Sequence, residues 1–481
     1  MDTLTVSSGG VLEVRMNARK GRSLYTSRLV KGGEIVIDEA PILLLVAPEM
    51  AQSTCIACLR AIGPKERIEC SACGQACFCS PSCQVVAHGT PWLHSVPLCS
   101  AYKRLAALCL PTDDQAQLRF LLHALALRHA GTPESERRFN ALCSLVGEPT
   151  ESEHAVALRL APYLKETLAG LSAAESLSLG EGELAMLLRK EQLNSYGVLA
   201  SQQQVATAAA LQTGSSGVCG RRGEATCGGM GGAGCSTNSG EADLPPGERE
   251  GGERRLRGSA IYAQASLVNH ECLPNVARFD FFDSGRPNST HVTFRALHDL
   301  PPGTELAQSY VPLHWNLAER QAQCRDVYGF DCTCPRCQTE SQWSDEDDVE
   351  SEWETDSDNG DMAADDAAVP AAGEPATGQS RDAGASEPCG DHEVEMQHAQ
   401  PIIRAPPGEE GPLEPTYLRL FLLKYMCAAP GCFGTAAPVK PGSTLLECNV
   451  CGCTRSEQEF LRELERSQQH QEQEQIWRQQ L

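Results

Sequence analysis

The pattern of apolar and polar positions divides the chain into two β-rich stretches separated by other material. Residues 11–46 alternate apolar and polar positions around two glycine turns, which predicts four short strands. Such a β-unit is too small to close a hydrophobic core by itself. Residues 258–330 return to the same pattern, with paired strands expected over 276–282 and 291–297 and a helix over 317–328.

Between the β-rich stretches the apolar spacing changes to that of helices. Leucines and alanines recur three or four positions apart over residues 100–211, for example at Leu184, Leu187 and Leu188. This spacing indicates a helical insert whose leucines form its core. Residues 194–198 indicate a turn-like break at its end.

Three stretches have compositions that are unsuited to a packed core. Residues 212–257 are rich in Gly, Ser and Glu, whereas residues 341–415 are acidic and then rich in Ala, Gly and Pro. Such segments bury too little apolar area to offset the entropy lost on ordering, so we expect both to be disordered. The Gln- and Glu-rich residues 456–481 are expected to form an exposed helix or a frayed tail.

Composition and charge narrow the classes of partner. The chain has 481 residues, 41% of them hydrophobic, which is enough for at least one sizeable core, and a formal net charge of -23. This charge makes direct nucleic-acid binding unfavourable and suits basic partners such as lysine-rich peptides. The chain shows neither an apolar run near the roughly 18 residues that span a bilayer nor a secretory signal. We therefore expect no membrane association and an intracellular location, in the cytoplasm, the nucleus or both.

The 24 cysteines indicate metal sites, because thiols inside the cell stay reduced. Residues 55–99 contain enough of them for two tetrahedral zinc sites, which need eight ligands. Seven cysteines and one histidine would supply these ligands, with His88 and His94 as rivals and Cys77 left over. The seven are Cys55, Cys58, Cys70, Cys73, Cys79, Cys83 and Cys99.

Two more cysteine clusters follow towards the C-terminus. The first, a Cys-x-Cys-x2-Cys cluster, is one ligand short of a closed structural site. Its members are Cys332, Cys334 and Cys337. The missing ligand must come from elsewhere, and the candidates are Cys272 and Cys324, of which Cys324 lies inside a predicted helix. Residues 416–455 place knuckles around short strands, as in a zinc ribbon, with Cys427, Cys432, Cys448 and Cys451 as candidate ligands.

Residues 266–275 lead from an apolar run into a polar group and end at Leu-Pro-Asn. Pro274 restricts the residue before it and lacks a backbone donor, so the buried segment is expected to stop at a turn. The polar side chains of Asn269 and His270 are costly to bury at such an end unless something pairs with them. A loop with a satisfied histidine is the alternative to a binding site.

Four motifs together resemble those of SET-domain lysine methyltransferases. Residues 269–275 (NHECLPN) look like the NHSCxPN signature, and residues 305–310 (ELAQSY) look like the GEELxxSY strand. Residues 328–337 resemble the YxFxCxCxxC junction, and residues 20–24 (KGRSL) resemble the N-terminal GRGL turn. The double zinc module resembles a MYND insert, which narrows the resemblance to the SMYD family. The ribbon, in place of a long helical-repeat C-terminus, resembles the fifth member's branch.

The resemblance implies an α+β protein whose β-rich SET fold is split by a zinc-binding MYND module and a helical insert, with a post-SET zinc site and a C-terminal zinc-ribbon-like segment. The expected divisions are 1–50 for the first half of the SET domain, 51–99 for the MYND module, 100–211 for the helical insert, 212–257 for the Gly/Ser-rich loop, 258–331 for the second, catalytic half, 332–340 for the post-SET cluster, 341–415 for the acidic insert, 416–455 for the ribbon and 456–481 for the tail.

The same resemblance implies an S-adenosylmethionine-dependent protein-lysine N-methyltransferase that acts on histone tails or other basic proteins. Tyr310 would be the catalytic tyrosine, and Tyr328 would shape the lysine channel. The cofactor would lie against Lys20, Gly21, Arg22, Asn194, Asn269 and His270. One zinc would bind Cys55, Cys58, Cys79 and Cys83, a second Cys70, Cys73, His94 and Cys99, and a third Cys272, Cys332, Cys334 and Cys337, with a fourth in the ribbon.

The chain departs from the family pattern at three places. Ser23 replaces the second glycine of the cofactor turn, which predicts a less close approach of the backbone to the cofactor. Glu271 stands where Ser is usual and adds charge beside the pocket. The spacing of His94 to Cys99 is one residue longer than usual, which keeps His88 as an alternative ligand.

Two other functions compete with methyl transfer. A catalytically weak adaptor would recruit protein partners through the MYND module and the ribbon. A zinc hydrolase needs an open metal position, whereas these sites are thiolate-rich and closed. We expect a monomer that binds a lysine-containing protein substrate.

Overall fold

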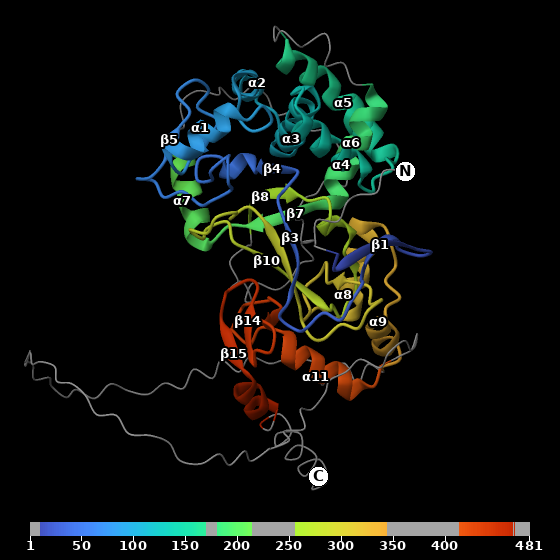
Figure 1. Cartoon of the computed structure of the whole chain (residues 1–481). Helices are drawn as coiled ribbons and strands as arrows, with labels where there is room; N and C mark the ends of the chain where they lie inside the picture. The colour runs from blue at the N-terminus through green and yellow to red at the C-terminus, as the bar shows by residue number, and fades with distance from the viewer. Residues whose placement is uncertain (1–9, 170–179, 214–254, 344–412, 465, 467–481) are drawn as a thin grey trace, which may run out of the picture.

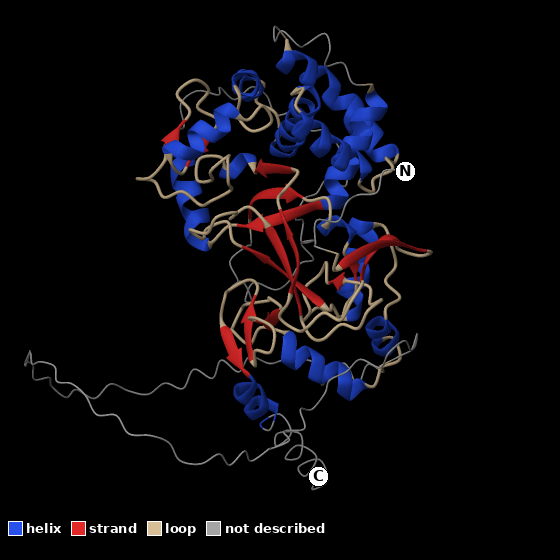
Figure 2. Ribbon diagram, in the orientation of Figure 1, coloured by secondary structure: helices blue, strands red, loops and turns tan. Residues whose placement is uncertain are grey.

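A computed structural model of the chain describes residues 10–169, 180–213, 255–343, 413–464 and 466. Most of residues 212–257, 341–415 and 456–481, whose composition is unsuited to a packed core, lies outside these residues. Helices gather at one end of the molecule, a small β-ribbon and a helix lie at the other, and the main strands lie between them (Figures 1 and 2). Within the described residues, no helix combines the length and apolar character needed to cross a bilayer.

The N-terminal stretch forms the four expected strands. They are β1 (Leu12–Asn17), β2 (Gly21–Thr26), β3 (Ile35–Glu39) and β4 (Leu43–Val46). β1 and β2 form an antiparallel hairpin in which Asn17 pairs with Gly21. Gly21 has a φ of 76°, a left-handed conformation that glycine adopts without steric cost.

The first β-unit obtains its core from strands far along the chain. β3 pairs with β11 (Val292–Ala296), which in turn pairs with β10 (Val276–Asp280). β4 pairs with β8 (Leu256–Ile261), and β9 (Asn269–His270) runs parallel to β12 (Ala307–Gln308). The two β-rich stretches therefore form one β-core, with buried side chains from both.

The turn-like break expected at residues 194–198 is wrong. Residues Ser195–Leu199 form strand β7, which pairs antiparallel with β8. The partner strand lies about 60 residues later, so local sequence carries little signal for it. A Cβ atom at Gly197 would come within 2.8 Å of Leu256 Cδ2, so a larger residue there would require that side chain to move.

The helical insert is confirmed by helices that share one core. They are α2 (Val96–Ala107), α3 (Thr112–His129), α4 (Pro133–Ser144), α5 (Glu151–Leu168) and α6 (Glu181–Asn194). A further helix, α7 (Gln202–Thr213), follows β7. Thr132 and Thr150 begin α4 and α5 with capping boxes, which satisfy otherwise unpaired backbone donors.

The cysteine-rich residues before this insert have little regular structure. Their elements are η1 (Pro48–Met50), β5 (Ile68–Glu69), β6 (Cys77–Phe78) and α1 (Pro81–Gly89). Ser80 caps α1 by accepting a hydrogen bond from the backbone N–H of Cys83 at 3.1 Å. Folds this poor in helix and strand depend on metal ligation for stability.

The C-terminal part wraps the β-core with helices and a three-stranded sheet. The elements are η2 (Ala265–Leu267), α8 (Leu317–Gln323), the π-helical η3 (Cys324–Tyr328), α9 (Pro335–Glu340), α11 (Pro415–Tyr425), β13 (Ala436–Pro438), β14 (Leu445–Cys448) and β15 (Thr454–Ser456). The expected short strands between the C-terminal knuckles are thus present, in the order β13-β14-β15.

Candidate active site and metal centres

The segment that carries Asn269 and His270 is held by a half-buried carboxylate. Glu39, at the end of β3, accepts hydrogen bonds from the backbone N–H groups of Ala263, Gln264 and Ala265 at 2.8–3.0 Å. Burial raises the pKa of Glu39, while these N–H groups oppose the shift. The carboxylate fixes the turn that leads through η2 into β9.

Asn269 joins three parts of the chain through its side-chain amide. Its Nδ2 donates to Ser23 Oγ at 2.6 Å, to Glu305 Oε1 at 3.2 Å and to the Arg22 carbonyl at 3.3 Å. The structure thus brings the 20–24 turn against Asn269, as expected. It also gives Ser23 a direct role, because the hydroxyl is buried against this amide.

Lys20 lies between two carboxylates. Its Nζ is 3.6 Å from Glu271 Oε2 and 3.3 Å from Glu305 Oε2. Burial lowers the pKa of Lys20, but the two carboxylates outweigh it and the net shift is upward. The charge that Glu271 adds to the site is therefore paired with Lys20.

Asn194 lies one loop away from the 20–24 turn. Its Nδ2 donates to the carbonyls of Val146 and Lys190 at 2.8 and 2.7 Å. Arg22 reaches the neighbouring carbonyl of Ser144 from the other side. The loop at residues 144–146 therefore connects Arg22 and Asn194, two of the expected cofactor residues. The described hydrogen bonds do not join these two side chains directly.

Tyr310 and Tyr328 lie together beside His270. The ring centroids of Tyr310 and Tyr328 are 4.8 Å apart, and those of His270 and Tyr310 are 5.2 Å apart. The Tyr310 hydroxyl donates to the Val268 carbonyl at 3.0 Å. Burial raises the pKa of Tyr310 well above its ordinary value, so the phenol stays protonated at neutral pH.

His270 is held in a defined state by its two ring nitrogens. Its Nδ1 accepts from the backbone N–H of Tyr310 at 3.0 Å, and its Nε2 lies 3.2 Å from Cys272 Sγ. Burial lowers the pKa of His270 to about 4, so the imidazole is neutral, with its proton on Nε2. His270 thus connects the candidate catalytic tyrosine to a candidate metal ligand.

Sequence reasoning missed several residues that support this site. Glu305 and Gln308 lie inside the ELAQSY motif of residues 305–310, but the resemblance that identified this motif implied no role for either residue. Tyr196 lies in the misassigned strand β7, and its hydroxyl accepts from Gln308 Nε2 and donates to the Ala265 carbonyl, each at 2.7 Å. Phe330 packs its ring 5.9 Å from that of His270. The aromatic pattern of residues 328–330 was the available signal for Phe330.

The structure brings all sixteen expected metal ligands into four groups. Within each group the ligand atoms lie within 4.8 Å of one another. The groups are Cys55, Cys58, Cys79 and Cys83; Cys70, Cys73, His94 and Cys99; Cys272, Cys332, Cys334 and Cys337; and Cys427, Cys432, Cys448 and Cys451.

The spacing of the sulfur atoms fits tetrahedral zinc. Zinc–sulfur bonds of about 2.3 Å give sulfur–sulfur edges of about 3.8 Å in a tetrahedron. Pairs within the groups lie at 3.5–3.9 Å, for example 3.7 Å for Cys58 with Cys79 and 3.8 Å for Cys272 with Cys332. The donor sets therefore fit closed, structural zinc sites.

Two alternatives left open by the sequence are separated by geometry. His94 Nε2 lies 3.5 Å from Cys73 Sγ, whereas His88 Nδ1 lies 3.1 Å from the backbone carbonyl of His94. Cys272 belongs to the third group, whereas Cys324 is buried beside it but outside the set of ligand atoms.

These features define the class of protein. A β-core built from both ends of the chain holds an Asn-His pair whose histidine contacts a half-buried tyrosine, beside several thiolate-rich groups that could hold zinc. Residues 21–311 match the SET domain, and the chain belongs to the SET-domain family.

Known relatives include several SET-domain proteins. The chain is 28% identical over 469 residues to the histone-lysine N-methyltransferase ASHR2 of Arabidopsis thaliana, covering 93% of this chain and 96% of that protein. It is 36% identical over 88 residues to human histone-lysine N-methyltransferase SMYD3, covering 18% and 19% of the two chains. The chain is thus related to SMYD-type methyltransferases. A solved SET domain of LSMT, bound to lysine and AdoHcy, overlaps 68% of this chain and 54% of its own with a TM-score of 0.28 at 9% identity.

Proposed function

We propose that the chain transfers a methyl group from S-adenosylmethionine to the side-chain amine of a protein lysine. The observation that carries this proposal is the contact of Tyr310 with His270, the neighbour of Asn269, held by the parallel pairing of β9 and β12. Membership of the SET-domain family supports it, as does similarity to a histone-lysine N-methyltransferase over almost the whole chain.

The reaction is an in-line displacement at carbon. S-adenosylmethionine supplies a methyl group bound to a positively charged sulfur. The sulfur is the leaving group and keeps the electron pair of the broken carbon–sulfur bond. The lysine amine must be neutral to attack, and a dry channel favours that form because burial lowers the pKa of lysine. Water accepts the proton that the methylated nitrogen releases.

The chain's own residues contribute positioning and exclusion of water. No covalent intermediate forms, so the Tyr310 hydroxyl does not act as a nucleophile. Its oxygen lone pairs instead accept a hydrogen bond from the amine and orient it. Tyr328, whose ring contacts that of Tyr310, forms a wall of the lysine channel. Asn269 and His270, with the turn at residues 20–22 and Asn194, hold the cofactor in this proposal.

The finer assignments follow the same reasoning. We place a MYND module at residues 51–99, a post-SET zinc site at residues 332–340 and a zinc ribbon at residues 416–455, each built on one or two of the described ligand groups. The ribbon supports the branch of the fifth SMYD member. Histone tails and other basic proteins are the proposed substrates, the cytoplasm and nucleus the proposed locations, and a monomer the proposed state.

A titration with S-adenosylmethionine separates this proposal from the adaptor alternative. The enzyme is expected to bind the cofactor with one site per chain, and Asn269→Ala is expected to weaken this binding strongly. If the chain only recruits partners, calorimetric titration with S-adenosylmethionine would show no saturable heat for either the unmutated protein or Asn269→Ala.

A further inference from the structure

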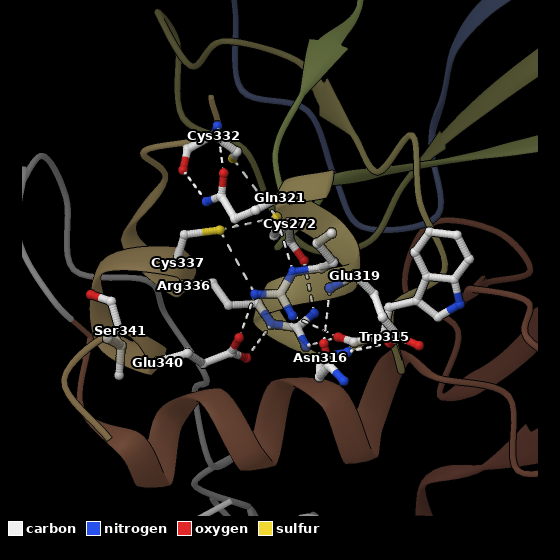
Figure 3. A network of polar contacts seen from close by, with 12 residues as sticks. Cys272, Trp315, Asn316, Glu319, Gln321, Cys332, Arg336, Cys337, Glu340 and Ser341 are labelled. Atoms are coloured by element: carbon white, nitrogen blue, oxygen red, sulfur yellow. Dashed lines mark hydrogen bonds and ion pairs between the residues drawn. The ribbon is translucent and has the colours of Figure 1, made fainter. Parts of the chain in front are cut away.

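Two arginines and one glutamate are buried against the third group of metal ligands. The side chains of Arg320, Arg336 and Glu340 are 0%, 4% and 8% exposed. Arg320 comes from α8, and the other two come from α9. Figure 3 shows Arg336 and Glu340 beside Cys272 and Cys337. Full burial of charges is costly unless they are paired, so this arrangement requires an explanation.

Arg320 donates directly to the sulfurs. Its Nε lies 3.3 Å from Cys272 Sγ, and its Nη2 lies 3.7 Å from Cys337 Sγ. His270 Nε2 also faces Cys272 Sγ. The nitrogen donors described for this group's sulfurs thus contact Cys272 or Cys337. Sulfur is a strong acceptor as a thiolate and a weak one as a thiol, so these contacts are suited to metal-bound thiolates.

The charges of the cluster also balance. A zinc ion with four thiolates carries a formal charge of about −2, which is unfavourable in a buried site. Arg320 and Arg336 bring two positive charges, and Glu340 bridges both guanidinium groups with one negative charge. The net charge of this trio offsets about half of that of a loaded site.

The two arginines are also bonded to the backbone beside Tyr310. Arg320 Nη1 donates to the Trp315 carbonyl at 2.6 Å, and Arg336 Nη1 donates to the Leu313 carbonyl at 2.8 Å. Both carbonyls lie within five residues of Tyr310. Arg336 additionally reaches the carbonyl of Cys272, two residues after His270.

We propose that Arg320, Arg336 and Glu340 form a positioning unit that stabilises the zinc thiolates of Cys272 and Cys337 and couples this metal site to the placement of Tyr310. The coupling to Tyr310 rests on the proposed methyl transfer, whereas the stabilisation of the thiolates does not. Residues around metal ligands commonly change metal affinity 10- to 100-fold when mutated.

The first test measures loss of zinc and the reactivity of individual cysteines. Full-length protein loaded with zinc is treated with an alkylating reagent and a chromophoric chelator, and modified peptides are quantified by mass spectrometry. In Arg320→Gln we expect Cys272 and Cys337 to be alkylated about tenfold faster or more, with Cys448 unchanged as an internal reference. Arg325→Gln is the matched control, because Arg325 is 62% exposed and pairs with Asp331 at the surface.

Arg320→Lys keeps the proposal testable if Arg320→Gln does not fold. Lysine retains the charge but cannot reach both sulfurs and the Trp315 carbonyl at once, so we expect an intermediate rate of alkylation. Equal alkylation rates in Arg320→Lys, Arg325→Gln and unmutated protein would overturn the stabilisation of the thiolates.

The second test measures the coupling. In the fraction of Arg320→Lys that retains zinc, we expect methyl transfer to fall at least about fivefold through kcat, while the dissociation constant of S-adenosylmethionine changes less. Unchanged transfer in that fraction would overturn the coupling. Absence of transfer by the unmutated protein would overturn the proposed function itself and leave the alkylation result standing.

Discussion

Ser23 is the acceptor of the shortest hydrogen bond made by Asn269. Its buried hydroxyl lies 2.6 Å from Asn269 Nδ2, in strand β2. The sequence predicted that this serine would keep the backbone away from the cofactor. The structure adds that the hydroxyl orients the asparagine.

Ser23→Ala is therefore expected to weaken cofactor binding. Loss of one hydrogen bond costs about 1 kcal/mol, which corresponds to roughly a fivefold higher dissociation constant for S-adenosylmethionine. Calorimetric titration measures it. Ser27→Ala is the control, because that exposed hydroxyl lies in the following turn and bonds the Gly10 carbonyl. Tighter binding by Ser23→Ala would mean that the serine obstructs the cofactor instead.

At this scale the sequence predicted the residues that carry unusual chemistry and missed those that support them. Asn269, His270 and Cys272 were conspicuous because polar groups interrupt an apolar run. Arg320 resembles any helical surface arginine in sequence, yet it is fully buried. Only the fold shows that its neighbours are sulfurs, because they lie 48 and 17 positions away.

Helix α6 carries an unusual carboxyl near its junction with β7. Glu191 accepts a hydrogen bond from Ser195 Oγ at 3.3 Å, and burial raises its pKa from 4.5 to about 7. The folded protein therefore holds this proton to higher pH than the unfolded chain does. Its contribution to stability is present below pH 4.5 and is lost as the pH rises through about 7.

Glu191→Gln is expected to remove this pH dependence. The variant should gain about 1 kcal/mol relative to the unmutated protein at pH 8.5 and nothing at pH 4.5, with part of the full shift screened by solvent. Thermal unfolding at the two pH values measures it. Glu166→Gln, at an exposed position on α5, serves as control. An equal difference in melting temperature at both pH values would contradict the assignment.

Elements with strong local patterns were predicted well, whereas β7 was not. Helices over residues 100–194 follow from leucine spacing, and β1 to β4 follow from alternation between glycine turns. β7 has neither signal, because its five residues include Gly197 and obtain their stability from β8, which lies far along the chain. Parallel pairing of β9 with β12 was likewise beyond local sequence.

The ribbon at the C-terminal end is packed against the β-core of the SET domain. Arg295 of β11 pairs with Glu447 of β14 at 2.9 Å and stacks 4.0 Å from the Phe279 ring. Asn449 Nδ2 donates to the Arg278 carbonyl at 2.8 Å. The ribbon therefore covers strands β10 and β11.

This arrangement predicts different results from removing the third and fourth zinc sites. Cys272→Ser and Cys448→Ser should each lower zinc content by about one ion per chain. Cys272→Ser should also weaken cofactor binding and methyl transfer, since Cys272 contacts His270. Cys448→Ser should lower the melting temperature by several degrees but keep cofactor affinity within a few-fold. Elemental analysis with calorimetry measures both, and equal loss of cofactor binding would contradict the separation.

For the whole molecule, the order of the β-rich, cysteine-rich and helical stretches could be predicted but their contacts could not. Cysteine spacing indicated the four ligand groups because tetrahedral ligation restricts which residues can serve. The fourth ligand of the third group remained open between Cys272 and Cys324, since both are compatible with the sequence. The closure of the β-core by strands from both ends depends on long-range packing, which spacing does not encode.

Transfer of a labelled methyl group tests the central claim most directly. Unmutated protein and Tyr310→Phe are incubated with labelled S-adenosylmethionine and basic proteins from cell extract, and labelled lysines are mapped. We expect transfer to lysine by the unmutated protein and at least about a hundredfold less by Tyr310→Phe, with zinc content and cofactor binding unchanged. A rate in Tyr310→Phe equal to that of the unmutated protein would contradict the account.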